Sequence, residues 1–320
     1  MRSFLHDPLL AILIGVCLSA SAIAQTTDSD TPVTSVIASD ASLDEDEVVE
    51  DVDVLERRVQ AELFALQNNF IIQQHHTNYI LPFTMVDEMS ASPLSPISDR
   101  KLQDHEAKFQ ISIKTPLYSN PENPLEGLYV AYTARSFWQI YNADVSRPFR
   151  ETNYEPEVFY RWVPNWSWGD LNVIAVSAGL NHQSNGQINV LSRSWNRVMG
   201  RVTMQYDDYF ALLTAWYRIP EDEKKSPDDS SGDDNPDITD YLGNFELTVG
   251  TRLDEVELSL MMRNNLSRSQ NRGFLEATVA YPVSDRFDVM IQASKGYGDS
   301  LIDYNENISR VSVGFRLRAF

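Results

Sequence analysis

Three side chains of the kinds used in acyl transfer stand close together in the sequence: His182, Ser184 and Asn196. A serine hydroxyl becomes a nucleophile when a neutral imidazole nitrogen takes its proton, and a third group must hold the other ring nitrogen as a donor. An asparagine carbonyl can orient the ring as an aspartate does. These types form a candidate hydrolase site, with Ser184 as nucleophile, His182 as base and Asn196 as orienting residue.

A β-hairpin would bring these three side chains together. His182 and Ser184 are two residues apart and therefore share one face of a strand. If 171–183 and 191–205 pair antiparallel around a turn near residue 189, His182 lies opposite Asn196, because paired residues keep a constant sum. Such residues are also common near turns in proteins without catalysis, so the residue types alone leave both interpretations open.

The faces of these two strands favour a membrane protein. Even positions of the first strand are mainly apolar, whereas odd positions of the second carry Arg193, Arg197 and Arg201. Three arginines on one strand face suit the polar lumen of a β-barrel better than the core of a soluble β-sandwich, the competing fold. We expect them to pair with carboxylates such as Glu246 or Glu276. The candidate catalytic residues then lie on the lipid-directed face, which implies a substrate that resides in the membrane.

Beyond residue 75 the chain alternates in polarity over segments of about ten residues, as barrel strands do. Short turns alternate with longer loops along the chain, and 118–126 is the exception. We therefore predict an all-β fold, a twelve-stranded antiparallel transmembrane β-barrel with an acidic N-terminal arm. The expected strands are 77–85, 106–117, 127–141, 153–164, 171–183, 191–205, 208–218, 240–251, 255–265, 272–282, 286–296 and 307–319.

Composition sets the limits of this interpretation. Residues 1–24 have the basic start, apolar run and small-residue end of a signal peptide, and the single cysteine, Cys17, lies inside them. Residues 25–75 form an acidic, poorly ordered arm with a short helical pattern near its end, and 76–320 form the barrel. A formal net charge of −20 excludes nucleic acid as a natural partner. After residue 24 no apolar run reaches 18 residues, which excludes a membrane-spanning helix.

Several blocks of sequence, in a fixed order, resemble the outer membrane phospholipase A family. They span most of 105–320, whereas 25–75 shows no useful match. The blocks run from Ser146 to Pro156, Asn181 to Gly186, Ser192 to Arg197, Asp233 to Thr239 and Tyr297 to Asn305.

The resemblance implies a twelve-stranded barrel in the bacterial outer membrane with phospholipase A1, A2 and lysophospholipase activity. The active site lies on the outer surface of the barrel, near the external leaflet. By motif position, it also implies Ser184 as nucleophile, His182 as base and Asn196 as orienting residue. Members of the family require Ca²⁺ and act as homodimers, with the acyl chain in a groove between the two barrels.

The resemblance also implies a calcium site shared between subunits. Its ligands are the Ser192 hydroxyl and the Gln187 carbonyl of one subunit and the carbonyl of Ser146 of the partner subunit. Two positions depart from the family. Ala134 replaces a glutamine that hydrogen-bonds across the dimer, which puts the strength of dimerisation in doubt. Asn189 replaces an aspartate of a second calcium site, and we do not predict that site.

Other candidates carry less chemistry. His75 and His76 are adjacent, so on a strand their rings point to opposite faces and do not form a metal site. The acidic residues around 221–234 could recruit divalent ions near lipopolysaccharide, but we favour the interpretation of a solvated external loop. Two further functions stay open, namely a passive porin-like barrel that has kept the motif, and an outer-membrane hydrolase that acts on lipid A.

Overall fold

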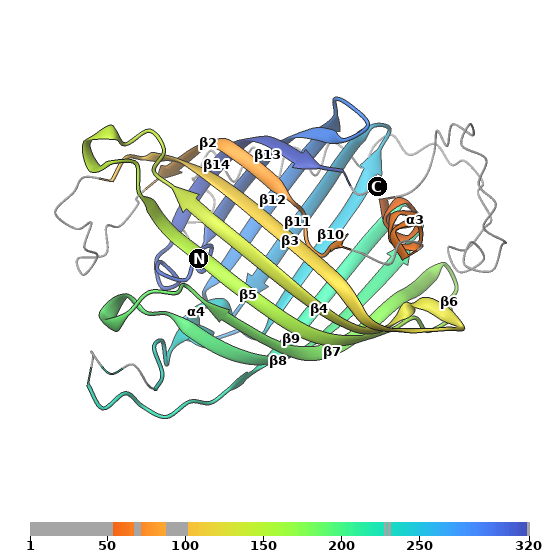
Figure 1. The fold of residues 1–320 in the computed structure, drawn as a ribbon, viewed down its shortest axis with the longest axis horizontal. Helices are drawn as coiled ribbons and strands as arrows, with labels where there is room; N and C mark the ends of the chain where they lie inside the picture. The colour runs from red at the N-terminus through yellow and green to blue at the C-terminus, as the bar shows by residue number, and fades with distance from the viewer. Residues whose placement is uncertain (1–53, 67–71, 88–101, 227–228, 230–231, 319–320) are drawn as a thin grey trace. The chain divides into compact units, whose positions relative to one another are not determined.

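The computed structural model describes residues 54–66, 72–87, 102–226, 229 and 232–318. Within these ranges the chain forms one closed antiparallel sheet of twelve long strands, with two short strands attached to it (Figure 1). The predicted signal peptide and most of the acidic arm lie outside the described residues. None of the described helices is both long and apolar enough to span a membrane.

The long strands follow the predicted order, and neighbours in sequence are neighbours in the sheet apart from the closing pair, β14 and β2. The strands are β1 (Gln73–Gln74), β2 (Tyr79–Asp87), β3 (His105–Asn120), β4 (Asn123–Trp138), β5 (Phe149–Trp162), β6 (Trp166–Trp168), β7 (Leu171–Ser184), β8 (Ser194–Tyr206), β9 (Tyr209–Ile219), β10 (Phe245–Leu253), β11 (Val256–Asn264), β12 (Gly273–Pro282), β13 (Phe287–Gly296) and β14 (Ile308–Leu317).

Alternation of polar and apolar residues explains why the sheet closes with its apolar face outward. On β14, Val313 and Phe315 are exposed, whereas Arg310 and Ser312, which have the opposite parity, are buried. An open sheet would expose unpaired backbone N–H and C=O groups at its edges to lipid, and closure into a barrel removes those edges. The predicted fold is confirmed.

Two connections between strands differ from the sequence-based expectations. The expected long connection 118–126 is a two-residue turn, because β3 and β4 both continue into it, and this removes the one exception to the loop alternation. The expected strand 240–251 begins instead with the helix α4 (Ile238–Leu242), which ends at Gly243, where φ is +69°. Ile238 and Leu242 of α4 are buried against an apolar cluster, so packing overrides strand propensity there.

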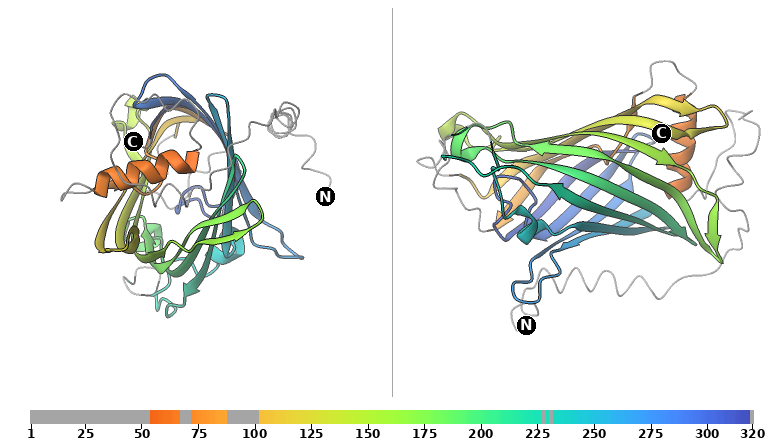
Figure 2. Two further views of the ribbon diagram at one scale, coloured as in Figure 1. Left: turned by 90° about the vertical axis from the view of Figure 1, so that its right-hand side faces the viewer. Right: turned by 90° about the horizontal axis from the view of Figure 1, so that it is seen from below.

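A second helix, α3 (Val54–Leu66), lies across the end of the barrel opposite α4 (Figures 1 and 2). Its residue Glu62 is buried and pairs with Lys114 of β3 at 2.5 Å and Arg161 of β5 at 2.6 Å. Burial opposes ionisation of Glu62, but the neighbouring cations outweigh it and hold the pKa of this carboxyl below its ordinary value. Buried ion pairs therefore fix α3 to the barrel wall.

The lumen is filled by charged side chains in contact with one another. Glu106 is buried and pairs with Arg150 at 3.0 Å and also with Arg310. Asp299 is buried between Lys108, at 3.0 Å, and Arg310, at 2.7 Å. Each charge has a partner of opposite sign, which offsets part of its desolvation penalty.

Arg197 and Arg201 of β8 face this lumen as predicted, but the partners named for them are wrong. Arg193 lies just before β8, and its guanidinium donates to the backbone carbonyls of Val190 and Ser192. Arg197 pairs with Glu155 at 2.7 Å and Arg201 with Glu157 at 2.5 Å, so both use carboxylates of β5 in place of Glu246 or Glu276. Glu155 and Glu157 lie one strand away from β8, across β7, whereas Glu276 on β12 lies three strands away, across β9, β10 and β11.

The expectation that His75 and His76 point apart is also wrong. Both residues follow the short strand β1, and their rings lie 4.1 Å apart between centroids, close to the buried Glu157. The His75 Nε2 atom lies 3.1 Å from one oxygen of Glu157, and the other oxygen binds Arg201. Arg58 also donates to the His75 carbonyl, so this trio sits among cations and serves the ion-pair network of the lumen.

Candidate active site

The hairpin β7–β8 places the candidate base and its orienting residue side by side. His182 and Asn196 are direct partners in the ladder, as the constant-sum argument predicted. The His182 Nδ1 atom lies 2.8 Å from Asn196 Oδ1. An amide oxygen only accepts, so Nδ1 carries the proton and Nε2 keeps the lone pair that a general base requires.

The site faces the outside of the barrel. Leu180 shares a strand face with His182, and Val198 shares one with Asn196. These two apolar side chains are 54% and 46% exposed, whereas Asn181 and Arg197, on the opposite faces, are buried. Ser184, the last residue of β7, lies two residues beyond His182 on this outer face. In the described part of the chain its hydroxyl forms no hydrogen bond with the imidazole ring, and such contacts commonly shorten only when substrate binds.

An apolar cluster supports the hairpin from the lumen side. Trp195 is fully buried in it, and the Trp195 indole donates to the Gln183 side chain at 2.8 Å, which fastens β8 to β7 behind the site. The cluster joins two strands, β8 and β9, with α4 and the loop between β13 and β14. It consists of Trp195, Met199, Trp216, Ile238, Leu242, Leu301 and Tyr304.

The loop between β9 and β10 folds back onto this hairpin. Asp234 accepts hydrogen bonds from the hydroxyls of Ser192 at 2.7 Å and Ser194 at 3.0 Å, and Lys224 lies 2.5 Å from its other oxygen. Burial opposes ionisation, but these donors outweigh it and hold the pKa of Asp234 below its ordinary value. The interpretation of this segment as a solvated loop is wrong for Asp234, because the carboxylate is committed to the site.

A second acidic residue of that loop contacts the site directly. Glu221 Oε1 accepts a hydrogen bond from Asn196 Nδ2 at 2.9 Å. Sequence reasoning missed this contact by grouping Glu221 with solvated acids. The register gave a signal, because Asn196 pairs with Ile219, and residue 221 has the same parity just beyond it.

The loop between β7 and β8 carries two of the implied calcium ligands, Gln187 and Ser192. The buried Asn185 organises this loop, since its side-chain oxygen accepts from the backbone N–H groups of Gln187 at 3.2 Å and Arg193 at 2.9 Å. The Ser192 hydroxyl donates a hydrogen bond to Asp234, which leaves the lone pairs of Ser192 Oγ available to a cation.

Ser146, the third implied ligand, is exposed on the separate loop between β4 and β5. Its backbone is left-handed, with φ of +63°, at the end of a short 3-10 helix, Ala143–Val145. Hydroxyl and carbonyl oxygens are the donors that Ca²⁺ prefers. The hydroxyl and carbonyl oxygens of these residues therefore fit calcium.

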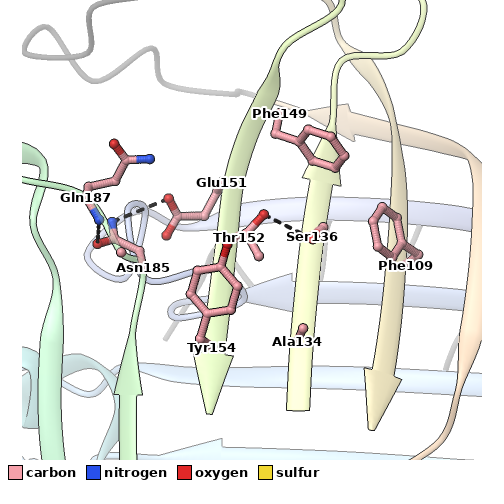
Figure 3. Close-up of a pocket in the computed structure, with 10 residues that line it drawn as sticks. Phe109, Ala134, Ser136, Phe149, Glu151, Thr152, Tyr154, Asn185 and Gln187 are labelled. Carbon is pink, nitrogen blue, oxygen red and sulfur yellow. Dashed lines mark hydrogen bonds between the residues drawn. The ribbon is translucent and has the colours of Figure 1, made fainter. Parts of the chain in front are cut away.

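An open pocket of about 450 Å³ lies beside Ser184 on the outer face of β3, β4 and β5. Tyr154 of β5 pairs with Ser184 in the ladder, which ties the pocket to the hairpin. Figure 3 shows Phe109 and Phe149 on one side of the pocket, Ala134 on β4, and a hydrogen bond from Asn185 of the loop to Glu151. The mixture of aromatic rings with a few polar groups suits an amphiphile at the membrane surface.

A family model described as Phospholipase A1 matches residues 55–317. The chain belongs to the phospholipase A1 family. Among curated members of the family, "Phospholipase A1" of Salmonella typhimurium is 35% identical over 251 residues, which are 78% of this chain and 82% of the relative.

Solved structures of phospholipase A family members share the fold. The calcium-bound dimer of the outer membrane phospholipase from Salmonella typhi is 35% identical, with a TM-score of 0.72, and the match covers 81% of this chain and 98% of that one. An active-site mutant of outer membrane phospholipase A from Escherichia coli, in which alanine replaces an asparagine, is 32% identical with a TM-score of 0.72 over the same shares.

Proposed function

We propose that this chain is a bacterial outer-membrane enzyme that hydrolyses the acyl esters of phospholipids, with Ser184, His182 and Asn196 as its catalytic site. The observation that carries the proposal is the 2.8 Å contact between His182 Nδ1 and Asn196 Oδ1 on the outer face of a closed barrel. Family membership supports the reaction class, and the asparagine mutant named for its active site supports the role of Asn196.

The chain's own residues account for the proton movements. Ser184 Oγ attacks the ester carbonyl carbon while its proton passes to His182 Nε2, and the collapse of the tetrahedral intermediate breaks the bond to the glycerol oxygen. The protonated imidazole donates to that leaving oxygen. Water then attacks the acyl-serine with His182 as base again, which releases the fatty acid and restores Ser184. The same chemistry acts at either acyl position and on lysophospholipids.

Calcium is the proposed cofactor, held by Ser192 Oγ, the Gln187 carbonyl and the carbonyl of Ser146 of the partner subunit. When bound, a hard cation next to the site stabilises negative charge that develops on the ester oxygen. The organisation of the loop by Asn185 and the orientation of Ser192 by Asp234 support this assignment. The calcium-bound dimer of the Salmonella typhi relative supports both the metal and a homodimer.

The proposed partner is a second copy of the chain, with the acyl chain bound between the two barrels. The pocket beside Ser184 supports this arrangement, because it is open on the lipid-facing side and lined by Ala134 and Tyr154. A second barrel that covered it would remove an acyl chain from contact with lipid and place it against Ser184.

The alternative of a passive pore is disfavoured by the lumen, where the charged residues Glu106, Lys108, Asp299 and Arg310 are buried. A water-filled channel would leave these charges hydrated. The other alternative, hydrolysis of lipid A in place of glycerophospholipid, is distinguished by comparing the two substrates.

The experiment is a substrate panel with the refolded full chain in detergent micelles. We expect fatty acid and lysophospholipid from diacyl phospholipids, and no release from lipid A under the same conditions. Release from lipid A alone would contradict the proposed substrate, and ion conductance in a planar bilayer without any lipid hydrolysis would support the passive barrel.

A further inference from the structure

The amide of Asn196 is held from both sides. Its oxygen lies 2.8 Å from His182 Nδ1, and its nitrogen donates to Glu221 Oε1 at 2.9 Å. The resulting chain of contacts runs from the imidazole through the amide to a carboxylate of the loop after β9. Glu221 therefore adds an acidic residue to a site whose orienting residue is neutral.

The direction of these two hydrogen bonds is fixed only by Glu221. The two ends of an asparagine amide have nearly the same shape, and a flipped amide would present its NH₂ group to His182. Nδ1 would then have to accept, the ring proton would move to Nε2, and Ser184 would lose its base. An ionised carboxylate only accepts, so Glu221 requires the NH₂ group on its own side and the oxygen on the side of His182.

Charge adds to this geometric effect. A hydrogen bond from a neutral amide to a carboxylate is stronger than one between neutral groups, and it polarises the amide so that its oxygen becomes a better acceptor. In the Ser-His-Asp arrangement the acid acts directly on the ring, whereas here it acts through the amide.

The segment that carries Glu221 is held in place. Asp222, the next residue, accepts a backbone hydrogen bond from Asp233 at 2.8 Å, and the Asp233 side chain lies 2.5 Å from Arg218 at the end of β9. Glu221 itself is half-buried, while its neighbour Glu223 is exposed. The carboxylate is thus presented to Asn196 by a loop that is closed on itself.

We propose that Glu221 is a positioning residue of the acyl-transfer site, which sets the orientation of the Asn196 amide and through it the tautomer of His182. The proposal rests on the proposed catalytic roles of Ser184, His182 and Asn196. Glu221 lies on the loop after β9, outside the sequence motifs around His182 and Asn196, so the proposal gives this loop a role in catalysis.

The test measures kcat and KM for phospholipid hydrolysis by the full chain with Glu221 changed to Ala, Gln or Asp. We expect Glu221→Ala to lower kcat on the order of 10-fold to 100-fold, with KM within about two-fold of wild type. The kcat of Glu221→Gln should lie between those of wild type and Glu221→Ala, because a glutamine amide can itself flip. Glu221→Asp should retain a higher kcat than Glu221→Gln because it keeps the carboxylate. Glu223→Gln removes the same charge two residues away and serves as the matched control.

A double-mutant comparison separates positioning from a merely structural role of the loop. If Glu221 acts through Asn196, then Glu221→Ala has no further effect on kcat in an Asn196→Ala background, because the group it positions is gone. Equal effects of Glu221→Ala in both backgrounds, or a kcat of Glu221→Ala within two-fold of wild type, would overturn the proposal. A wild-type chain that releases no fatty acid would instead refute the proposed function, so the two failures are distinguishable.

Discussion

Asn196 stands between His182 and Glu221, with its oxygen 2.8 Å from the ring nitrogen and its nitrogen 2.9 Å from the carboxylate. This arrangement predicts that an aspartate, the usual third member of such sites, is harmful here. Asn196→Asp would face Glu221 with a second carboxylate and no donor, and we expect kcat to fall roughly 10-fold to 100-fold. Activity is measured as fatty-acid release at saturating substrate.

The compensating change is Glu221→Gln, which supplies an NH₂ group to the new carboxylate. The variant with both Asn196→Asp and Glu221→Gln should therefore recover most of the activity lost by Asn196→Asp alone. If Asn196→Asp is as active as wild type, the two side chains do not face each other in the working enzyme.

Lys224 neutralises Asp234 beside the proposed calcium ligand Ser192, at a separation of 2.5 Å. Removing this cation leaves the carboxylate free to attract Ca²⁺, so Lys224→Gln should bind calcium several-fold more tightly. Calorimetric titration of the refolded protein with Ca²⁺ measures the affinity directly. Lys225→Gln, at an exposed neighbouring position, is the control, and an equal gain in both variants would show a general charge effect only.

Ala134 lies in the lipid-facing pocket beside Tyr154, where the family resemblance implies a glutamine that bonds across the dimer. Ala134→Gln should increase the dimeric fraction in calcium-containing micelles, because a polar pair between barrels in an apolar medium is worth about 0.6 to 2 kcal/mol. Sedimentation equilibrium in density-matched detergent gives the dimer constant. An unchanged constant would place the dimer contact elsewhere on the barrel.

Glu62 fixes α3 to the barrel through Lys114 and Arg161. Because its pKa is lowered in the folded state, its ion pairs contribute stability above the ordinary carboxyl value of 4.5, and this contribution is lost as the pH falls toward the lowered pKa. At neutral pH, Glu62→Gln leaves two buried cations without this partner, a change that costs about 3 to 5 kcal/mol.

Limited trypsin digestion measures that effect, since Arg57 and Arg58 lie on α3. We expect the Glu62→Gln protein to be cleaved there much faster than wild type, whereas Glu56→Gln, in the first turn of the helix, should behave as wild type. Equal cleavage rates would mean that other contacts hold α3.

The predictable parts of this protein are those set by periodicity. The two-residue periodicity of polar and apolar residues predicted the twelve strands, the outward face of the site and the pairing of His182 with Asn196. Few registers are possible once one face of each strand must contact lipid. The same rule failed for His75 and His76, which follow the two-residue strand β1 and so escape its alternation.

Loop contacts could not be predicted in the same way. Glu221 and Asp234 reach the hairpin through a long connection whose path depends on tertiary packing, and their acidic neighbours gave them the appearance of solvated residues. The helix α4 was missed for a similar reason, since its apolar residues fit a strand pattern until the cluster around Trp195 provides a partner for them.

The most direct test of the proposed site compares Ser184→Ala with Ser167→Ala, an exposed serine between β5 and β7, each in calcium and in excess chelator. We predict that wild type and Ser167→Ala release fatty acid in calcium, and that a sulfonyl fluoride labels both. Ser184→Ala should lose release on the order of 10³-fold or more and lose labelling, while it remains folded. Release by a folded Ser184→Ala protein at the wild-type rate would contradict the assignment of Ser184 as nucleophile.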